Sequence, residues 1–255
     1  MPVTTLGSLW SPLEPDALAR AAGPAWTVRL LPTATSTNAV AAERPVAGTV
    51  VVADHQTAGR GRLDRTWDTP PGTALTFSAV VDPRLDDAAW PLLPLASALA
   101  VAEGVRRTTG IAPTLKWPND LLLGEDKVAG ILLERVVADR PLAIIGIGIN
   151  VGMRADQLPV HTATSLAIAG SDASRTAVFG GVVQALAAGL ASLRADPAGM
   201  LTAYRDGCGT LGREVTVHLP DGSEHRGTAT AIDDHGRIVV GDLIVGAGDV
   251  LHVRA

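Results

Sequence analysis

The chain of 255 residues contains a single cysteine, Cys208, so no disulfide can form within it. A chain without disulfides is typical of a reducing compartment. The N-terminus has no basic segment followed by an apolar stretch, and no run of about 18 consecutive apolar residues occurs. We therefore expect a cytoplasmic protein without a secretory signal or a membrane span.

Positive charge is also scarce, because the net charge is −5 and the isoelectric point is about 5.6. Binding to nucleic acid needs a basic face that neutralises phosphates, so this composition disfavours it. The six histidines show no metal-ligand spacing, and no structural zinc site is expected. Hydrophobic residues make up 47% of the chain, which is ample for a packed core.

The pattern of strands and helices predicts two parts. A larger domain over 1–207 alternates the two kinds of element. Its predicted strands are 26–31, 49–54, 73–81, 115–117, 127–137 and 142–151, and its predicted helices follow 36–38 and cover about 94–109, 174–193 and 197–205. A small all-β domain over 208–255 has predicted strands at 214–219, 223–233, 237–240, 243–245 and 250–253. So small a domain needs to pack on the larger one.

The segment from Gln56 to Trp67 is predicted to be a loop, and it concentrates positive charge in an otherwise acidic chain. Its core reads Gly59-Arg60-Gly61-Arg62-Leu63-Asp64-Arg65. Glycines let a ligand approach the backbone, and arginines bind phosphate or carboxylate. Trp67 could stack on a purine. The alternatives are a solvated basic loop or an RNA contact, and the spacing matches neither common glycine-rich nucleotide motif.

Lysines and carboxylates follow further along the chain. In Lys116-Trp117-Pro118-Asn119-Asp120, the lysine could bind phosphate and the aspartate could hold Mg²⁺ or accept a proton, although a simple turn explains the same residues. Lys127 opens the predicted apolar strand that carries Gly130 and Glu134, and it could neutralise charge on an acyl phosphate or merely close the preceding turn.

Two more segments complete the set. Gly146 and Gly148 interrupt a buried strand that ends at Asn150, which indicates that something approaches the backbone there. Ser36-Thr37-Asn38 could bind a small polar group or only cap a helix.

Together, and in their order along the chain, these five segments resemble the biotin–protein ligase family. The resemblance covers about 30–152 and continues more weakly at Gly212-Arg213-Glu214-Val215. It implies an α+β fold: a mixed β-sheet catalytic domain with flanking helices, like that of class II synthetases, plus a small C-terminal SH3-like β-barrel. It also implies that biotin and ATP form biotinyl-5′-adenylate with Mg²⁺, and that a lysine of a biotin carboxyl carrier protein domain of acyl-CoA carboxylase then takes the biotinyl group.

The resemblance assigns a role to each site residue. Catalytic roles go to Lys127, Arg62 and Asp120, and Asp120 is also the candidate metal ligand. The implied biotin contacts are Ser36, Thr37, Asn38, Gln56, Gly59, Arg60, Arg62, Lys127, Gly130 and Gly148. The implied ATP or adenylate contacts are Arg60, Arg62, Arg65, Trp67, Lys116, Asn119, Lys127, Asn150 and Arg213.

One departure from the family pattern is Asp64, where many members have a small or neutral residue, and we expect it to tune the closing of the loop. We also predict that residues 58 to 66 are mobile without ligand, because the reactive adenylate has to be shielded from water. Only about 25 residues precede the first core strand, so we expect no DNA-binding domain, and we expect a monomer or weak homodimer.

Three rival functions stay open at this point. A lipoate–protein ligase or an octanoyltransferase shares the catalytic fold, but the transferase uses a cysteine nucleophile, and Cys208 lies outside the motif-bearing core. The lipoate ligase motifs are not found. A non-catalytic biotin or nucleotide sensor is the third rival, and intact Lys127 and Arg62 argue against it.

Overall fold

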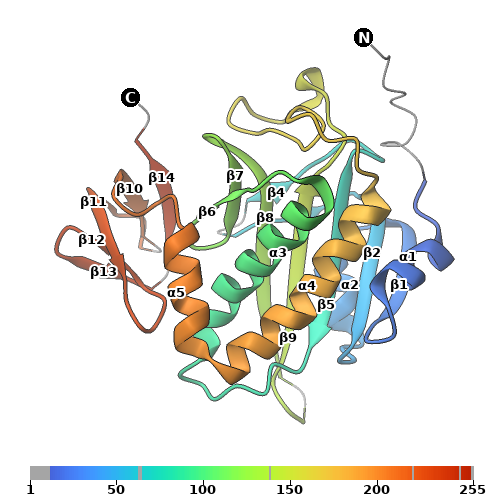
Figure 1. Ribbon diagram of the computed structural model, residues 1–255, viewed down its shortest axis with the longest axis horizontal. Coiled ribbons are helices and arrows are strands. Elements are labelled where there is room, and N and C mark those ends of the chain that lie inside the picture. The colour runs from blue at the N-terminus through green and yellow to red at the C-terminus, as the bar shows by residue number, and fades with distance from the viewer. Residues whose placement is uncertain (1–11, 63–64, 138, 220, 247, 254–255) are drawn as a thin grey trace.

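Two sheets organise the part of the chain that the computed structural model describes, namely residues 12–62, 65–137, 139–219, 221–246 and 248–253 (Figure 1). The larger is a seven-stranded mixed sheet. Its strands, in spatial order, are β1 (Thr27–Ala34), β2 (Thr49–Gln56), β5 (Ala74–Val81), β9 (Leu142–Asn150), β8 (Asp126–Val136), β7 (Asp120–Leu123) and β6 (Thr114–Lys116). The β1–β2 pair is parallel and every other neighbouring pair is antiparallel.

Helices cover the two faces of this sheet unequally. The long helices α3 (Leu93–Thr109) and α4 (Arg175–Ala195) pack together on one face, with α1 (Pro15–Ala22) and α5 (Pro197–Gly207) beside them (Figure 1). The short α2 (Thr37–Glu43) packs on the opposite face. The sequence sets these boundaries locally, since the Ser174 hydroxyl accepts from the Ala177 amide at the start of α4, and α3 ends at Gly110 with a φ of 73°.

The two faces of the sheet differ because successive side chains on a strand point to opposite sides. The face under α3 and α4 is apolar, and there Phe77 meets Phe179 edge to face with ring centroids 5.2 Å apart. On the other face, β5 and β9 present Thr76, Ser78, Gly146, Gly148 and Asn150. Small and polar residues on that face leave room for a ligand.

Helix α4 is long and apolar enough to cross a membrane by length and composition, with half of the relevant window buried inside the structure. Its apolar side chains pack against α3 and the sheet. A core helix therefore accounts for this composition.

The smaller sheet holds five strands in the order β13 (Leu243–Val245), β12 (Ile238–Val240), β11 (Glu224–Ile232), β10 (Glu214–His218) and β14 (Asp249–His252), all antiparallel. It docks on the larger part, as predicted. The Trp117 indole donates to the Gly236 carbonyl at 2.9 Å, and Arg205 Nε donates to the Ile232 carbonyl at 2.8 Å. The α+β class and the five-stranded C-terminal module are thus confirmed.

Four elements differ from the expectation. Helix α1 was not predicted, and β7 occupies the stretch between the strands predicted at 115–117 and 127–137. The segment expected to be a loop contains two short paired strands, β3 (Gly59–Arg60) and β4 (Thr66–Trp67). Elements of two to four residues are too short for a periodic signal. The domain boundary at 207 stays a prediction, and Cys208 still bridges to Leu115 at the edge of the larger sheet.

Candidate active site

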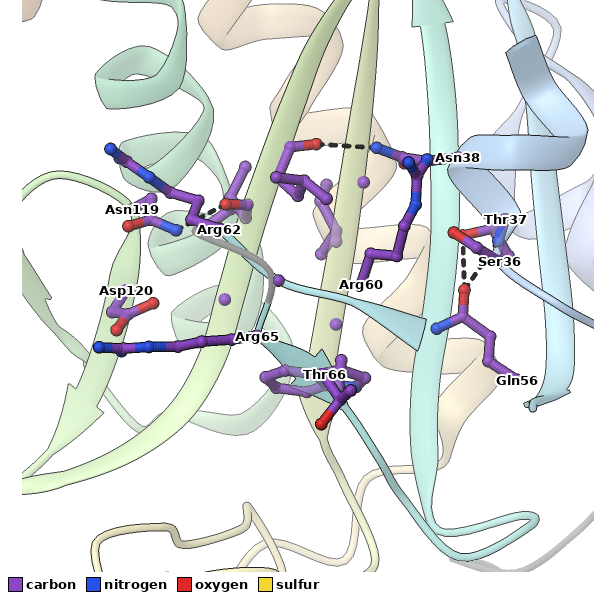
Figure 2. Close-up of a pocket in the computed structure, with 18 of the residues that line it drawn as sticks. Ser36, Thr37, Asn38, Gln56, Arg60, Arg62, Arg65, Thr66, Asn119 and Asp120 are labelled. Carbon is purple, nitrogen blue, oxygen red and sulfur yellow. Dashed lines mark hydrogen bonds between the residues drawn. The ribbon is translucent and has the colours of Figure 1, made fainter. Parts of the chain in front are cut away.

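A pocket opens on the polar face of the larger sheet, between α2, the β3–β4 pair and strands β7, β8 and β9 (Figure 2). Most of the predicted site residues line it, although they come from five separate stretches of the chain. The wall includes Ser36, Thr37, Asn38, Gln56, Arg60, Arg62, Arg65, Trp67, Asn119, Asp120, Lys127, Gly130 and Gly148. The sequence motifs therefore converge on one site.

At one end of the pocket, buried polar groups form a connected network. Gln56 Oε1 accepts from the Thr37 amide at 2.7 Å and from the Thr37 hydroxyl at 3.1 Å. The Ser78 hydroxyl lies 2.7 Å from Thr37 Oγ1 and 2.6 Å from Asn38 Oδ1. Ser36 is also buried there, with 5% of its surface exposed. Ser78 belongs to no motif, and only its position opposite Gly146 in the β5–β9 register shows that it joins the site.

The middle of the pocket is shaped by glycines that lie beneath Trp67. A Cβ placed on Gly148 would lie 2.6 Å from Trp67 Cε2, and one on Gly130 would lie 3.4 Å from Trp67 Cζ3. The indole therefore rests directly on the backbone of β9 and β8. Its Nε1 is buried and has no hydrogen-bond partner among the described residues. Close approach of the ring to the sheet explains Gly148, whereas at Gly130 the tighter neighbours are Cε and Nζ of Lys127, each 3.1 Å from an added Cβ.

At the other end, Asp120 lies between two lysines. Lys127 Nζ is 2.6 Å from Asp120 Oδ1, and Lys116 Nζ is 3.9 Å from Asp120 Oδ2. Burial lowers the pKa of Lys116, and the nearby carboxylate of Asp120 opposes that shift. The backbone of Lys127 is held on both sides, since its amide donates to the Thr162 carbonyl and its carbonyl accepts from the Thr164 amide.

The C-terminal sheet contributes to this same end. Arg65 pairs with Asp249 at the start of β14, and Arg62 Nη2 donates to the Gly248 carbonyl at 3.2 Å. Burial lowers the pKa of Arg62, while Asp249 and Asp120 act in the opposite direction. Four cationic side chains thus surround two carboxylates. This excess of positive charge suits a polyphosphate.

Four predicted residues lie outside the pocket wall. Gly59 lines an adjoining cavity beside Arg60, and Lys116 reaches the site only through Asp120. Asn150, 3% exposed, donates to the Thr164 carbonyl at 2.8 Å, and its Oδ1 has no hydrogen-bond partner among the described residues. Arg213 pairs with Glu125 at 2.6 Å and takes no part in the wall.

The residues do not form a metal site by themselves. Among the described residues, no group of three or more His, Cys, Asp or Glu side chains could hold an ion. Mg²⁺ prefers about six oxygen ligands in octahedral geometry, whereas Asp120 faces two ammonium groups. The metal role of Asp120 therefore stays a prediction that its surroundings do not favour.

Two further expectations concern Cys208 and the loop. Cys208 is buried, and burial raises the pKa of its thiol, as it raises the pKa of the buried Tyr204 hydroxyl. Both features fit a packing residue better than a nucleophile. Asp64 lies outside the described residues, and the predicted mobility of 58–66 stays a prediction.

Comparisons with known proteins identify the family of this chain. Residues 30–151 match the Biotin/lipoate A/B protein ligase family, and residues 210–253 match the Biotin protein ligase C terminal domain. The chain is 34% identical over 217 residues to a biotin–[acetyl-CoA-carboxylase] ligase of Mycobacterium tuberculosis, which covers 81% of this chain and 80% of the relative.

A bifunctional ligase/repressor BirA of Bacillus spizizenii is 44% identical over 114 residues, which is 44% of this chain and 35% of that protein. Among solved structures, a biotin protein ligase from Aquifex aeolicus, in complex with biotin and ATP, superposes with a TM-score of 0.77 and 30% identity. That match covers 90% of this chain and 99% of the Aquifex chain. On the sequence motifs, the fold and these relatives, the chain belongs to the biotin protein ligase family and is a ligase.

Proposed function

We propose that this chain activates biotin with ATP and transfers the biotinyl group to a lysine of a biotin carboxyl carrier domain. The observation that carries the proposal is the polarity of the pocket. A hydrogen-bonding network closes one end, four cations surround the other, and Trp67 lies between them. The names of the Mycobacterium and Aquifex relatives support the same substrates.

The network end suits the ureido head of biotin. Thr37 Oγ1 is already engaged with Gln56 and Ser78. The Gln56 side-chain amide and the Ser36 hydroxyl, in contrast, have no recorded partner for their N–H and O–H groups among the described residues. A urea-like group has one carbonyl acceptor and two N–H donors. These two side chains are therefore the groups we assign to it.

Lys127 is the residue we assign to the chemical step. A carboxylate oxygen of biotin attacks the α-phosphorus of ATP, and the bond to pyrophosphate breaks as the acyl–phosphate bond forms. Negative charge then builds on the α-phosphate oxygens. A lysine whose backbone is clamped and whose ammonium lies in the pocket stabilises that charge. In this step Lys127 moves from Asp120 to the substrates.

Asp120 gains a second use once Lys127 has moved. The carrier lysine attacks the acyl carbon of the adenylate as a neutral amine, AMP leaves, and one proton must be removed. The freed carboxylate of Asp120, 8% exposed, is the acceptor that we assign to this proton. Mg²⁺ enters in this proposal with the ATP phosphates rather than as a resident ion.

The adenine contacts that we assign are Trp67, in the middle of the pocket, and Asn150, which is buried on β9. The indole offers a flat face for stacking. The buried Oδ1 of Asn150 lacks a partner among the described residues, and a buried acceptor without a donor is costly. An exocyclic amino group would satisfy it. We further propose that the protein acts in the cytoplasm as a monomer or a weak homodimer.

The test is exchange of labelled pyrophosphate into ATP, measured with biotin, lipoate or octanoate in parallel. Exchange that depends on biotin supports the proposal. Exchange with lipoate instead would replace the substrate while keeping the adenylating chemistry. Absence of exchange with every acid, in folded protein, would contradict the proposal and favour a biotin or nucleotide sensor.

A further inference from the structure

Glu134 on β8 lines the cavity that adjoins the pocket and touches two site residues at once. Its Oε2 accepts from Asn38 Nδ2 at 2.6 Å and pairs with Arg60 Nη2 at 3.0 Å. The period of two along β8 places Gly130, Leu132 and Glu134 on one face, so its side chain emerges on the pocket side of the sheet. The sequence motifs assign no role to this carboxylate.

The amide of Asn38 is fully used by protein groups. Its Nδ2 donates to Glu134 and, at 3.2 Å, to the Leu132 carbonyl, while its Oδ1 lies 2.6 Å from Ser78 Oγ. An amide has two N–H groups and one oxygen, so little capacity is left for a ligand. The sequence predicted that Asn38 contacts biotin. Its hydrogen bonds instead favour a role in which Asn38 connects Glu134 to Ser78.

The backbone of β9 at Gly146 also fixes the position of the Asn38 side chain. A Cβ on Gly146 would lie under 3.0 Å from the Asn38 amide, so the side chain is seated against the backbone of β9. Figure 2 shows Asn38 and the Arg60 side chain next to each other beside this strand. Any displacement of Glu134 would therefore act on both residues.

We propose that Glu134 is a positioning residue that holds Asn38 beneath the head-group end and Arg60 above it. It thereby couples binding of the biotin head group to the position of the glycine–arginine loop, and this inference rests on the proposed function. The Arg60 and Glu134 side chains are 48% and 33% exposed, and such ion pairs add little to stability. The effect of Glu134 is on substrate binding rather than on folding.

Two variants separate its two contacts. In E134Q, the new amide oxygen still accepts from Asn38, but the charge that attracts Arg60 is lost. In E134A, both contacts are lost. Loss of a charge-assisted hydrogen bond predicts that the KM for biotin rises about tenfold or more in E134A and by about two- to fivefold in E134Q. The kcat stays within about twofold, and the KM for ATP rises less than the KM for biotin, because Asn38 is assigned to the biotin end alone.

The matched control is D87N, which acts on Arg135, the residue that follows Glu134 on β8. Arg135 pairs with Asp87 at 2.8 Å on the exposed surface, and D87N removes that pair without touching the pocket. D87N leaves the KM for biotin and the melting temperature unchanged. Equal changes in the KM values for biotin and ATP in E134A, or no change in either, would overturn the assignment.

A second readout does not depend on the substrate. Trypsin cleaves after arginine, and the loop carries Arg60 and Arg62. Without ligand, cleavage after Arg60 is expected to be several-fold faster in E134Q and E134A than in the wild type or D87N. Unchanged cleavage would overturn the positioning role. If wild-type protein fails biotin-dependent exchange, the proposed function fails, while cleavage still decides whether Glu134 holds the loop.

Discussion

A methyl group added at Gly148 would collide with the face of Trp67, and the consequence can be worked out from the structure. The new Cβ would lie 2.6 Å from Cε2, 2.8 Å from Cζ2 and 2.9 Å from Nε1 of the indole. Ordinary carbon contacts are about 3.5–4.0 Å. The Gly148→Ala variant therefore requires the ring to move by about 1 Å or the strand to yield.

The ring is the part expected to move. Strand β4, which carries Trp67, has only two residues, and the indole Nε1 is held by no hydrogen bond among the described residues. Loss of a stacking geometry costs about 0.5–1.5 kcal/mol, so the KM for ATP rises about two- to tenfold. If the ring stayed in place, overpacking would cost about 1–3 kcal/mol instead.

Steady-state kinetics and thermal unfolding distinguish these outcomes. We expect a raised KM for ATP with a melting temperature lowered by no more than about 4 °C. Gly227→Ala is the control, because its Cβ would meet nothing closer than 3.4 Å. A Gly148→Ala variant with normal KM for ATP and normal melting temperature would refute the seating of Trp67 on β9.

Three further predictions follow from the same structure. Lys127→Ala abolishes pyrophosphate exchange while circular dichroism and melting temperature stay near wild type; retained turnover would remove Lys127 from the mechanism. Hydrogen bonds from Arg106 and Arg107 lower the pKa of Glu103 to about 2, so Glu103 stabilises the fold above its unfolded pKa of about 4.3 and loses this effect as the pH falls towards 2. Glu103→Gln then lowers the free energy of unfolding by no more than about 1 kcal/mol at pH 7 and by nothing near pH 2, as denaturant titrations will measure. Because burial raises the pKa of its thiol, Cys208 reacts with an alkylating reagent much more slowly in folded than in unfolded protein; equal rates would contradict its packing role.

Much of the site could be predicted from the sequence, because its motifs are local. Lys127, Gly130 and Gly148 stand on strands whose apolar runs are visible in the sequence, and Gln56 ends a β-branched strand. Their convergence follows from the sheet order, which places β8 and β9 side by side. The five strands of the C-terminal module were likewise evident from their turns.

The residues that were missed depend on contacts between distant segments. Ser78 gains its role only through the register of β5 against β9, and Glu134 only through the fold of α2 and the β3–β4 pair. Asp249 meets Arg65 across the interface between the two sheets, so no local pattern indicates it. Arg213 is a conspicuous motif residue that the structure pairs with Glu125 outside the pocket wall, and its contact with ATP stays a prediction.

The most direct test of the proposed activity is transfer to a protein. Purified chain, biotin and ATP with Mg²⁺ would be incubated with a biotin carboxyl carrier domain, and the product analysed by mass spectrometry. The account predicts one added biotinyl group on one lysine, no addition when that lysine is arginine, and no addition with the Lys127→Ala enzyme. An unmodified carrier after incubation with wild-type enzyme that performs biotin-dependent exchange would contradict transfer, and modification by Lys127→Ala would contradict the assigned chemistry.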